Sequence, residues 1–316
     1  MTLFRLGDRW KYSGPIFDAH THIGAINDID EMIKIEDDFG VSRQLGIVHD
    51  QDGFKAAKEK YPDRFVFAKY LSLKDIAQYN VEPVLEQIET LREEGFTVAK
   101  TWFGPRWRDW QKVIEGFRID HPRLEPIYES LEDKDIPLII HIGDPDTYYA
   151  NQYKDSEKYG TKDAHLQELQ NLLARHPGLR FQVPHFAAQP EIHRLPHLED
   201  WMEKYPNFVM DTASSRWMAR ELSKDTEKSH EFIVKYQDRI MFGTDLFARS
   251  SNDLPYYSGR YIAQRILWET NERDTPLPFN DADTENTGGT FIDGLDLPQK
   301  ILKKLYWENA NSFYGV

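Results

Sequence analysis

The chain contains no cysteine. This absence excludes disulfide bonds, cysteine-ligated zinc sites and thiol nucleophiles, so histidine and carboxylate side chains are the candidate metal ligands. Long apolar runs are also missing. No stretch approaches the roughly 18 apolar residues of a transmembrane helix, and residues 1–11 lack the apolar core of a signal peptide. We therefore expect a cytoplasmic protein that does not enter a membrane.

The chain has fewer basic than acidic residues. The 316 residues include 39 Lys and Arg against 53 Asp and Glu, which gives a formal net charge of −14. An excess of negative charge argues against binding to nucleic acid or to an anionic membrane surface. With 40% hydrophobic and 29% charged residues, the composition is that of an ordinary globular protein.

Short apolar runs recur along the chain, and eight of them are expected to be β-strands. They cover Ile16–His22, Gln44–His49, Phe65–Leu71, Thr97–Phe103, Pro137–Ile142, Arg180–Phe186, Phe208–Ala213 and Ile240–Leu246. Helical spacing is found between them, for example in Val84–Glu94, Leu124–Lys134, His165–His176, Glu191–Tyr205 and Leu222–Tyr236. Alternating strands and helices predict βα units on a parallel sheet. Eight units favour a distorted TIM-type (β/α)8 barrel over an open doubly wound sheet, because no Gly-rich phosphate loop follows the first strand.

The pattern changes after about residue 250. Tyr261–Thr270 has helical spacing, and Asn271–Leu297 is rich in Asp, Asn, Gly, Thr and Pro, which predicts a long polar loop or insertion. The segment from Leu297 to Asn311 is expected to be a closing helix. We expect one domain over residues 1–316, with a barrel core at about 14–250 and a C-terminal helical segment at about 251–316.

The first predicted strand ends in the pair His20 and His22. Side chains alternate along a strand, so both imidazoles point to the same side. Other predicted strands end in His141, His185 and Asp245. The C-terminal ends of barrel strands share one face, and a buried polar cluster without a metal or partners would be costly. The sequence therefore predicts a metal site on this face.

These residues and their order resemble the amidohydrolase superfamily, in particular the amidohydrolase-related branch that includes aminocarboxymuconate-semialdehyde decarboxylase. The matching motifs are Asp18-Ala19-His20-Thr21-His22, Leu138-Ile139-Ile140-His141, Pro184-His185-Phe186-Ala187 and Phe242-Gly243-Thr244-Asp245. Leu305-Tyr306-Trp307-Glu308-Asn309-Ala310 is similar to the closing helix of that branch. The resemblance extends over nearly the whole chain from residue 14.

The resemblance implies one divalent metal ion with an open coordination position. Its ligands would be His20, His22, His141 and Asp245, together with a water, and His185 would be the acid/base residue. Zinc is the expected ion, with manganese and iron as alternatives. Asp245 could instead act as a general base that only touches the metal, and the sequence leaves both roles open.

Lys100, near the end of the fourth predicted strand, leaves open whether the site holds one metal ion or two. In binuclear members of the superfamily a carboxylated lysine at this place bridges two ions. The alternative is a lysine that pairs with a carboxylate or meets an anionic substrate. We expect the alternative, and hence a single ion.

Candidate substrate contacts follow the fourth, seventh and eighth strands. The segment 102–110 is dense in tryptophan and arginine, and it supplies Trp102 and Arg106. Arg216 and Arg249 follow the later strands. Aromatic walls and guanidinium groups suit a small, planar or carboxylate-bearing molecule. The expected partner is therefore a small anionic substrate; the resemblance also leaves a homodimer open.

The leading hypothesis is a metal-dependent hydrolase. Metal-activated water would attack a C–O or C–N bond of a small carboxylated molecule, such as a lactone or an amide, and His185 would shuttle the proton. The alternative is non-oxidative decarboxylation of an aromatic or enoic acid, in which Arg216 holds the substrate and His185 or Asp245 protonates carbon. A hydratase is a minor third reading. A non-catalytic binding protein would be expected to lack some of the ligands, and the sequence has all of them.

Overall fold

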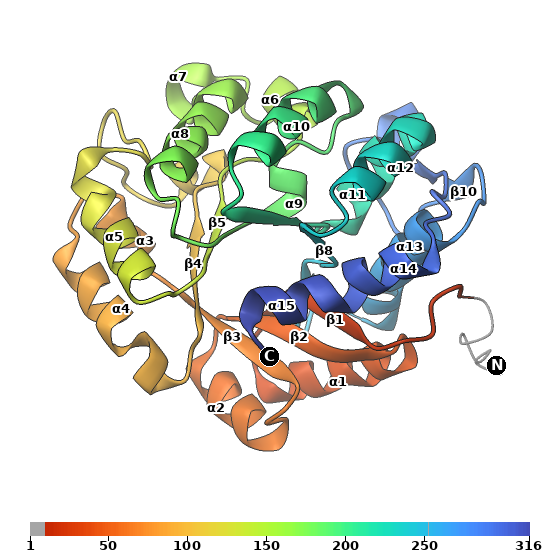
Figure 1. Cartoon of the computed structure of the whole chain (residues 1–316), viewed down its shortest axis with the longest axis horizontal. Helices are drawn as coiled ribbons and strands as arrows, with labels where there is room; N and C mark the ends of the chain where they lie inside the picture. Colours follow the sequence, from red (N-terminus) through yellow and green to blue (C-terminus); the bar gives the residue numbers. More distant parts are fainter. Residues whose placement is uncertain (1–9, 252) are drawn as a thin grey trace. The chain divides into compact units, whose positions relative to one another are not determined.

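Strands and helices alternate along the computed structural model, which describes residues 10–251 and 253–316 (Figure 1). Residues 1–9, which make up most of the segment used above to argue against a signal peptide, lie outside the described part. The strands are β1 (Ile16–Ile23), β2 (Val41–Val48), β3 (Phe65–Tyr70), β4 (Val98–Trp102), β5 (Leu138–His141), β6 (Phe181–Val183), β7 (Phe208–Asp211), β8 (Ile240–Met241), β9 (Leu246–Phe247), β10 (Thr275–Pro276) and β11 (Phe291–Ile292).

The helices follow the strands in the order expected for βα units. They are α1 (Ile26–Asp38), α2 (Gln51–Lys60), α3 (Leu73–Ile76), α4 (Glu82–Glu94), α5 (Glu125–Asp133), α6 (Asp146–Ala150), α7 (Ser156–Tyr159), α8 (Lys162–Arg175), α9 (Pro184–Ala187), α10 (Leu195–Lys204), α11 (Ser215–Leu222), α12 (Thr226–Lys235), α13 (Leu254–Glu269), α14 (Gln299–Lys303) and α15 (Asn309–Tyr314). Short 3-10 turns occupy Pro105–Asp109, Pro122–Leu124, Ile192–Arg194, Ser223–Asp225 and Glu285–Thr287, and Lys304–Glu308 is π-helical. Within the described ranges, no helix combines the length and the apolar character needed to cross a bilayer.

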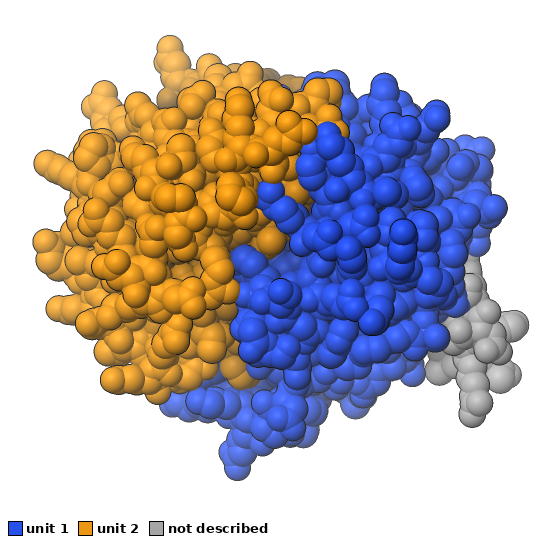
Figure 2. Space-filling view, in the orientation of Figure 1, with its two compact units in different colours: residues 1–66, 190–195, 211–316 blue, residues 67–189, 196–210 orange. Residues whose placement is uncertain are grey.

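The chain divides into two compact units, coloured blue and orange in Figure 2. Unit 1 contains residues 1–66, 190–195 and 211–316, and unit 2 contains residues 67–189 and 196–210. In unit 1, β1 pairs in parallel with β2 on one side and β9 on the other. In unit 2, β4 pairs in parallel with β3 and β5, and β6 with β5 and β7. The parallel arrangement of the strands is confirmed; the single domain over 1–316 stays a prediction.

In unit 1 the alternation of β1 sorts its side chains as the sequence predicts. The hydroxyl of Thr21 donates to the side chain of Gln44 and lies 2.8 Å from the carbonyl of Leu45, on the side of β2. His20 and His22 point the other way, with their ring centroids 5.3 Å apart. Figure 1 shows α1 and α2 next to β1 and β2. The two imidazoles therefore stand together on one side of a buried strand.

In unit 2 the central strand β5 is fully buried along Leu138, Ile139 and Ile140. A continuous apolar run is expected for a parallel strand that is covered on both faces. The helix α4 ends at Gly95, whose φ of 99° is the left-handed conformation that suits glycine after a helix. In the same unit, Thr161 caps the start of α8, and its side chain accepts a hydrogen bond from the backbone N–H of Ala164.

Two predicted strands end differently in the structure. The strand expected over Ile240–Leu246 is split into β8 and β9, because Asp245 adopts a φ of +61° that no continuous strand allows. The strand expected to reach Phe186 stops at Val183, because His185, Phe186, Ala187 and Ala188 all have φ between 53° and 59°. Four successive non-glycine residues in the left-handed region are unusual and strained. Smaller shifts move the start of β2 to Val41 and the end of β7 to Asp211.

The C-terminal segment is helical where predicted, with different limits. The helix α13 begins seven residues before the expected Tyr261, at Leu254, because Asp253 caps it and Pro255 suits its first turn. The polar insertion at 271–297 is mostly loop, with the short antiparallel pair β10 and β11. The predicted closing helix is α14 and α15 with the π-helical turn between them, and it extends to Tyr314.

Candidate metal centre

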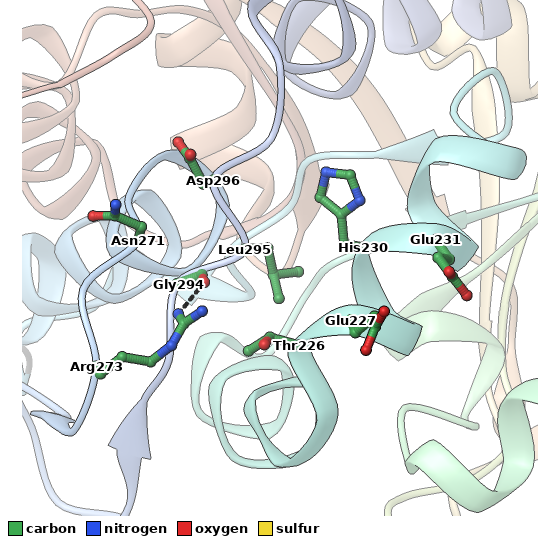
Figure 3. Close-up of a pocket in the computed structure, with 9 residues that line it drawn as sticks. All are labelled: Thr226, Glu227, His230, Glu231, Asn271, Arg273, Gly294, Leu295 and Asp296. Carbon is green, nitrogen blue, oxygen red and sulfur yellow. Dashed lines mark hydrogen bonds between the residues drawn. The ribbon is translucent and has the colours of Figure 1, made fainter.

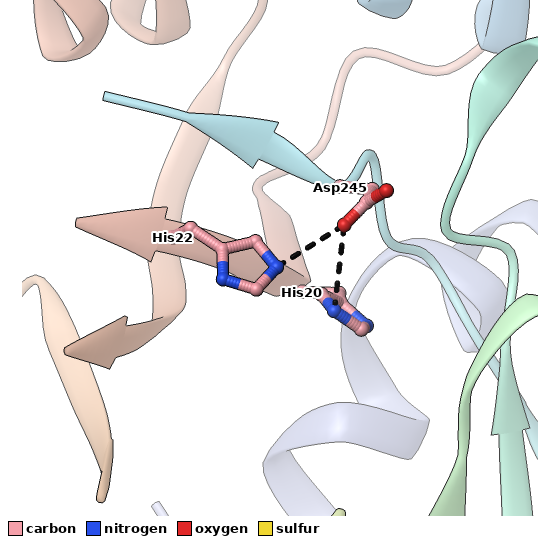
Figure 4. A group of neighbouring side chains, drawn as sticks. All are labelled: His20, His22 and Asp245. Atoms are coloured by element: carbon pink, nitrogen blue, oxygen red, sulfur yellow. Dashed lines mark hydrogen bonds and ion pairs between the residues drawn. The ribbon is translucent and has the colours of Figure 1, made fainter. Parts of the chain in front are cut away.

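Three of the four predicted metal ligands meet in unit 1. His20, His22 and Asp245 each offer a ligand atom, and these atoms lie within 4.8 Å of one another (Figure 4). The Oδ1 atom of Asp245 is 3.2 Å from His22 Nε2 and 3.6 Å from His20 Nε2. Both imidazoles therefore turn their Nε2 atoms toward one carboxylate.

Asp211, at the end of β7, fixes the ring of His20. Its Oδ2 atom is 2.9 Å from His20 Nδ1, and both side chains are almost inaccessible, with 0% and 1% of their surface exposed. The other oxygen of Asp211 accepts a hydrogen bond from the backbone N–H of Ala213. Since a carboxylate behind Nδ1 leaves Nε2 as the outward nitrogen, this contact orients His20 as a metal-binding histidine requires.

His22 is held from its other side. Its Nδ1 atom is 2.8 Å from His49 Nε2, and its ring stacks on Phe247 at 5.4 Å with an interplanar angle of 8°. Phe247 lies on β9, which pairs with β1 so that His22 and Phe247 are in register. The pairing of β9 with β1 thus explains why the ring of His22 cannot turn freely.

The turn that carries Asp245 is anchored to β1 by a buried acid. Asp18 accepts hydrogen bonds from the backbone N–H of His20 and from both the backbone N–H and the hydroxyl of Thr244. Tyr261 also donates to Asp18. Burial raises the pKa of Asp18 to about 8, although the hydrogen bond from Thr244 opposes the rise and nearby Glu36 adds to it. Asp18 therefore ties His20 to the backbone just before Asp245.

The donor set fits a divalent transition metal. Two imidazole nitrogens and one carboxylate oxygen suit zinc, manganese or iron. Asp211 and His49 supply the outer partners that metal-bound imidazoles usually have. The remaining positions would be left for a fourth protein ligand and for a substrate or water.

The other predicted site residues form a second group, in unit 2. His141 Nδ1 is 3.0 Å from His185 Nε2, and His141 Nε2 is 3.1 Å from Asp144 Oδ1. Tyr153 donates a hydrogen bond of 2.6 Å to the second oxygen of Asp144. Although burial opposes it, the hydrogen bonds from His141 and Tyr153 lower the pKa of Asp144. Asp144 is then an ionised acceptor, and His141 donates to it from Nε2.

Trp102, Arg106 and Lys100 also belong to unit 2. The ring of Trp102 lies 5.5 Å from that of His141 and stacks on Trp110 at 5.4 Å. The guanidinium of Arg106 is 5.5 Å from the Trp110 ring. Lys100 is buried in β4. The structure therefore places the stacked rings of Trp102 and Trp110, with Arg106 over Trp110, next to His141.

Arg249 and Arg216 belong to unit 1. The guanidinium of Arg249 lies 5.2 Å from the ring of Phe247, the residue that stacks on His22. Arg216, in the first turn of α11, lies over the ring of Trp217. The structure thus brings Arg249 toward the cluster of His20, His22 and Asp245 through Phe247. A joint site that also contains His141 and His185 stays a prediction.

Sequence reasoning missed two of the positioning residues, Asp211 and Phe247. Asp211 gave a usable signal, because it is an acid near the end of the predicted strand Phe208–Ala213. Phe247 gave no such signal in the sequence, since its role depends on the split of the eighth strand.

A cavity of about 450 Å³ lies elsewhere in unit 1, between α12 and residues 271–296, where Arg273 donates to the carbonyl of Gly294 (Figure 3). It includes none of the predicted site residues.

Several solved structures are similar to this chain. The chain is similar to the solved 5-carboxyvanillate decarboxylase of Novosphingobium aromaticivorans, which holds manganese and 4-hydroxy-3-methoxy-5-nitrobenzoic acid (14% identity, TM-score 0.58, 96% of this chain and 97% of that chain). It is also similar to a 2,6-dihydroxybenzoate decarboxylase in complex with 2,6-dihydroxybenzoate (15% identity, TM-score 0.54, 96% of this chain and 99% of that chain). A third similar structure is the 5-carboxyvanillate decarboxylase of Sphingomonas paucimobilis (12% identity, TM-score 0.56, 96% of this chain and 100% of that chain).

These likenesses show that the chain has the TIM-type (β/α)8 barrel fold. No curated protein matches the sequence. The model of the amidohydrolase family matches residues 56–316, which is well over half of the chain. The resemblance seen in the sequence is confirmed, and the chain belongs to the amidohydrolase family.

Proposed function

We propose that the protein is a metal-dependent decarboxylase, which removes CO2 from a small aromatic or enoic acid without oxidising it. The sequence alone favoured hydrolysis of a C–O or C–N bond. Decarboxylation is better supported, because several of the structures that match this chain over 96% of its length are those of benzoate-type decarboxylases. Fold likeness is an analogy for function, so the site must carry the argument.

The observation that carries the proposal is the cluster of His20, His22 and Asp245, with all three ligand atoms within 4.8 Å. We propose that one divalent ion binds there, with His141 as the fourth protein ligand. Manganese is the first ion to test, because a similar decarboxylase holds it; zinc, the ion expected from the sequence, is the second. His141 would have to exchange one of its present partners, His185 or Asp144, to reach an ion.

A bound divalent ion would supply positive charge that holds and polarises the substrate oxygens. Arg249 and Arg216 would bind the substrate carboxylates and so orient the C–C bond that breaks. The stack of Trp102 and Trp110 offers a planar surface for an aromatic ring. The bond electrons stay on the substrate carbon when CO2 leaves, and that carbon must then gain a proton. We assign the proton to His185 Nε2 or to the carboxyl group of Asp245, the two candidates from the sequence.

The test is CO2 release from a panel of hydroxybenzoates and muconate-type acids, set against lactone opening, with manganese or zinc added. We expect metal-dependent CO2 release and no lactone opening. Asp245→Asn should lower the rate by at least about 100-fold, since it removes a ligand and a proton carrier; Asp274→Asn, an exposed change in the insertion, should not. Lactone opening without CO2 release would restore the hydrolase hypothesis.

A further inference from the structure

A second cavity, of about 390 Å³, lies entirely within unit 2. Its walls come from the segment 108–117, which follows β4, and from residues 157–168 of α7 and α8. The polar groups that line it include Arg108, Gln111, His165 and Glu168. None of them is part of the proposed catalytic site, so the cavity requires an explanation of its own.

Arg108 is a half-buried cation that makes no ion pair within the described part of the chain. Across the described residues, 10–251 and 253–316, its guanidinium has no hydrogen-bond or ion-pair partner, and it lies over the ring of Trp107, 5.9 Å from the ring centroid. Burial lowers the pKa of Arg108, while Glu168 and Tyr149 oppose the decrease. Other buried arginines are paired: Arg64 with Glu36 and Arg265 with Glu269. A desolvated charge without a partner is costly.

The protonation state of Glu168 determines whether this side chain can donate a hydrogen bond to a ligand in the cavity. One oxygen of Glu168 accepts from the backbone N–H of Ile119, and burial raises the pKa of Glu168 to about 7. The ionisable groups that face it are Asp120, which adds to the rise, Arg118 and Arg108, which oppose it, and the hydroxyls of Tyr79 and Tyr128.

His165 adds no charge to the cavity. Its Nε2 atom lies 2.8 Å from the carbonyl oxygen of Tyr159 and so donates to it. Burial lowers the pKa of His165 to about 4, which keeps the ring neutral. Arg108 is therefore the fixed positive charge inside, and neutral Glu168 can donate a hydrogen bond from its second oxygen.

The rest of the wall limits the size and charge of a ligand. Val113, Ile114 and Phe117 supply an apolar side. At the rim, Glu115 and Glu157 are exposed acids, and Lys158 is paired with Asp109. Exposed acids at the mouth repel a multiply charged anion, whereas one carboxylate on an apolar body meets a cation, a donor and an apolar wall.

We propose that this cavity binds a small monocarboxylate, whose carboxylate group pairs with Arg108 and accepts a hydrogen bond from neutral Glu168 while its apolar body packs against Phe117 and Ile114. The cavity shares no residue with the cluster of His20, His22 and Asp245, and binding there does not require the ligand to react. Tyr149 lies between the cavity and the group of His141, His185 and Asp144: its ring is 6.3 Å from that of His165 and 5.4 Å from that of Tyr153, which donates to Asp144.

The experiment is photolabelling of the full-length protein with 4-azidobenzoate below saturation, followed by peptide mapping. We expect label in the peptides that contain residues 108–117 and 157–168. Arg108→Gln should reduce that label at least tenfold, and Arg123→Gln, an exposed arginine of the same unit, should leave it unchanged. Label found only elsewhere, or equal label in Arg108→Gln, would overturn the proposal. The result does not depend on whether the protein decarboxylates anything.

A second arm remains decisive even if Arg108→Gln fails to fold. Between pH 6 and pH 8 the neutral fraction of Glu168 falls about tenfold, so labelling of the parent should fall by about the same factor. Glu168→Gln keeps a neutral donor at every pH and should retain at pH 8 the label that the parent shows at pH 6. If Glu168→Gln keeps the pH dependence of the parent, Glu168 is not part of the site and the proposal is wrong.

Discussion

His49 Nε2 lies 2.8 Å from His22 Nδ1, so the two imidazoles at the ends of β2 and β1 form one hydrogen-bonded pair. The backbone N–H of His49 donates to the carbonyl of Ile23, which fixes His49 beside the strand that carries His22. One nitrogen of His22 is thereby engaged, and Nε2 faces Asp245. His49 is thus a positioning residue for a proposed metal ligand.

We expect His49→Ala to weaken metal binding by about 10- to 100-fold, the usual cost of removing the outer partner of a metal-bound histidine. Isothermal titration calorimetry of manganese or zinc with the metal-stripped protein measures the metal affinity. The absorption spectrum of the cobalt-substituted protein reports the changed ligand geometry. His49→Gln should recover part of the affinity. His230→Ala, on α12, is the matched control and should bind as the parent does. Unchanged affinity in His49→Ala would refute the positioning role.

The Asp211 carboxylate should matter for the same reason on the other side of the cluster. Asp211→Asn keeps the size of the side chain but replaces one carboxylate oxygen by an amide nitrogen, so it no longer favours a proton on His20 Nδ1. We expect metal affinity to fall by about tenfold with little change in folding. Chelator competition measures the affinity, and Asp274→Asn serves as the control. An affinity equal to that of the parent would mean that the buried surroundings orient His20 without the carboxylate.

Much of the architecture could be predicted from local pattern, because buried apolar runs such as Leu138–Ile140 leave few alternatives for a strand. The pair His20 and His22 could be predicted from the period of two, and Asp245 from its place after an apolar run. The left-handed turn at His185 could not, since nothing local favours φ > 0 at alanine or phenylalanine. Nor could the contact of Phe247 with His22, which depends on β9 pairing with a strand more than 200 residues earlier.

The raised pKa of Glu168 predicts a pH-dependent contribution to stability. A carboxyl whose pKa rises from 4.5 unfolded to about 7 folded binds more protons in the folded state between those values. Its destabilising effect is absent below about pH 4.5, grows as the pH rises and is complete above about pH 7. Glu168→Gln should therefore raise the free energy of unfolding at pH 8 by about 3 kcal/mol and leave it nearly unchanged at pH 4.5.

Urea denaturation at the two pH values measures the effect. Glu129→Gln, an exposed change on α5, is the control and should alter stability equally at both. If Glu168→Gln were no more stabilising at pH 8 than at pH 4.5, the acid would not be held in its neutral form by the fold.

Arg220 attaches the polar insertion to α11. Its guanidinium makes 2.8 Å contacts with Glu221, Asp281 and Asp283, and all four side chains are at most 7% exposed. Removing one partner of a buried ionic network typically costs about 3–5 kcal/mol. Arg220→Met should therefore destabilise the protein by about that amount and make residues 271–297 susceptible to limited proteolysis. Lys224→Met, which removes an exposed partner of Glu221, should cost less than about 1 kcal/mol. Equal losses in both variants would contradict a special role of Arg220.

Lys100 decides between one and two ions. A bridging carboxylated lysine would need both His141 and His185 to give up their mutual contact and bind a second ion, whereas the proposed single ion requires only His141 to exchange a partner. The cluster of His20, His22 and Asp245 already offers ligands for one ion. We therefore expect metal analysis to give one ion per chain in the parent and in Lys100→Met, whose side chain matches the length of lysine and suits a buried strand. Lys74→Met, in α3, is the control. Two ions in the parent and one in Lys100→Met would instead establish the bridging role.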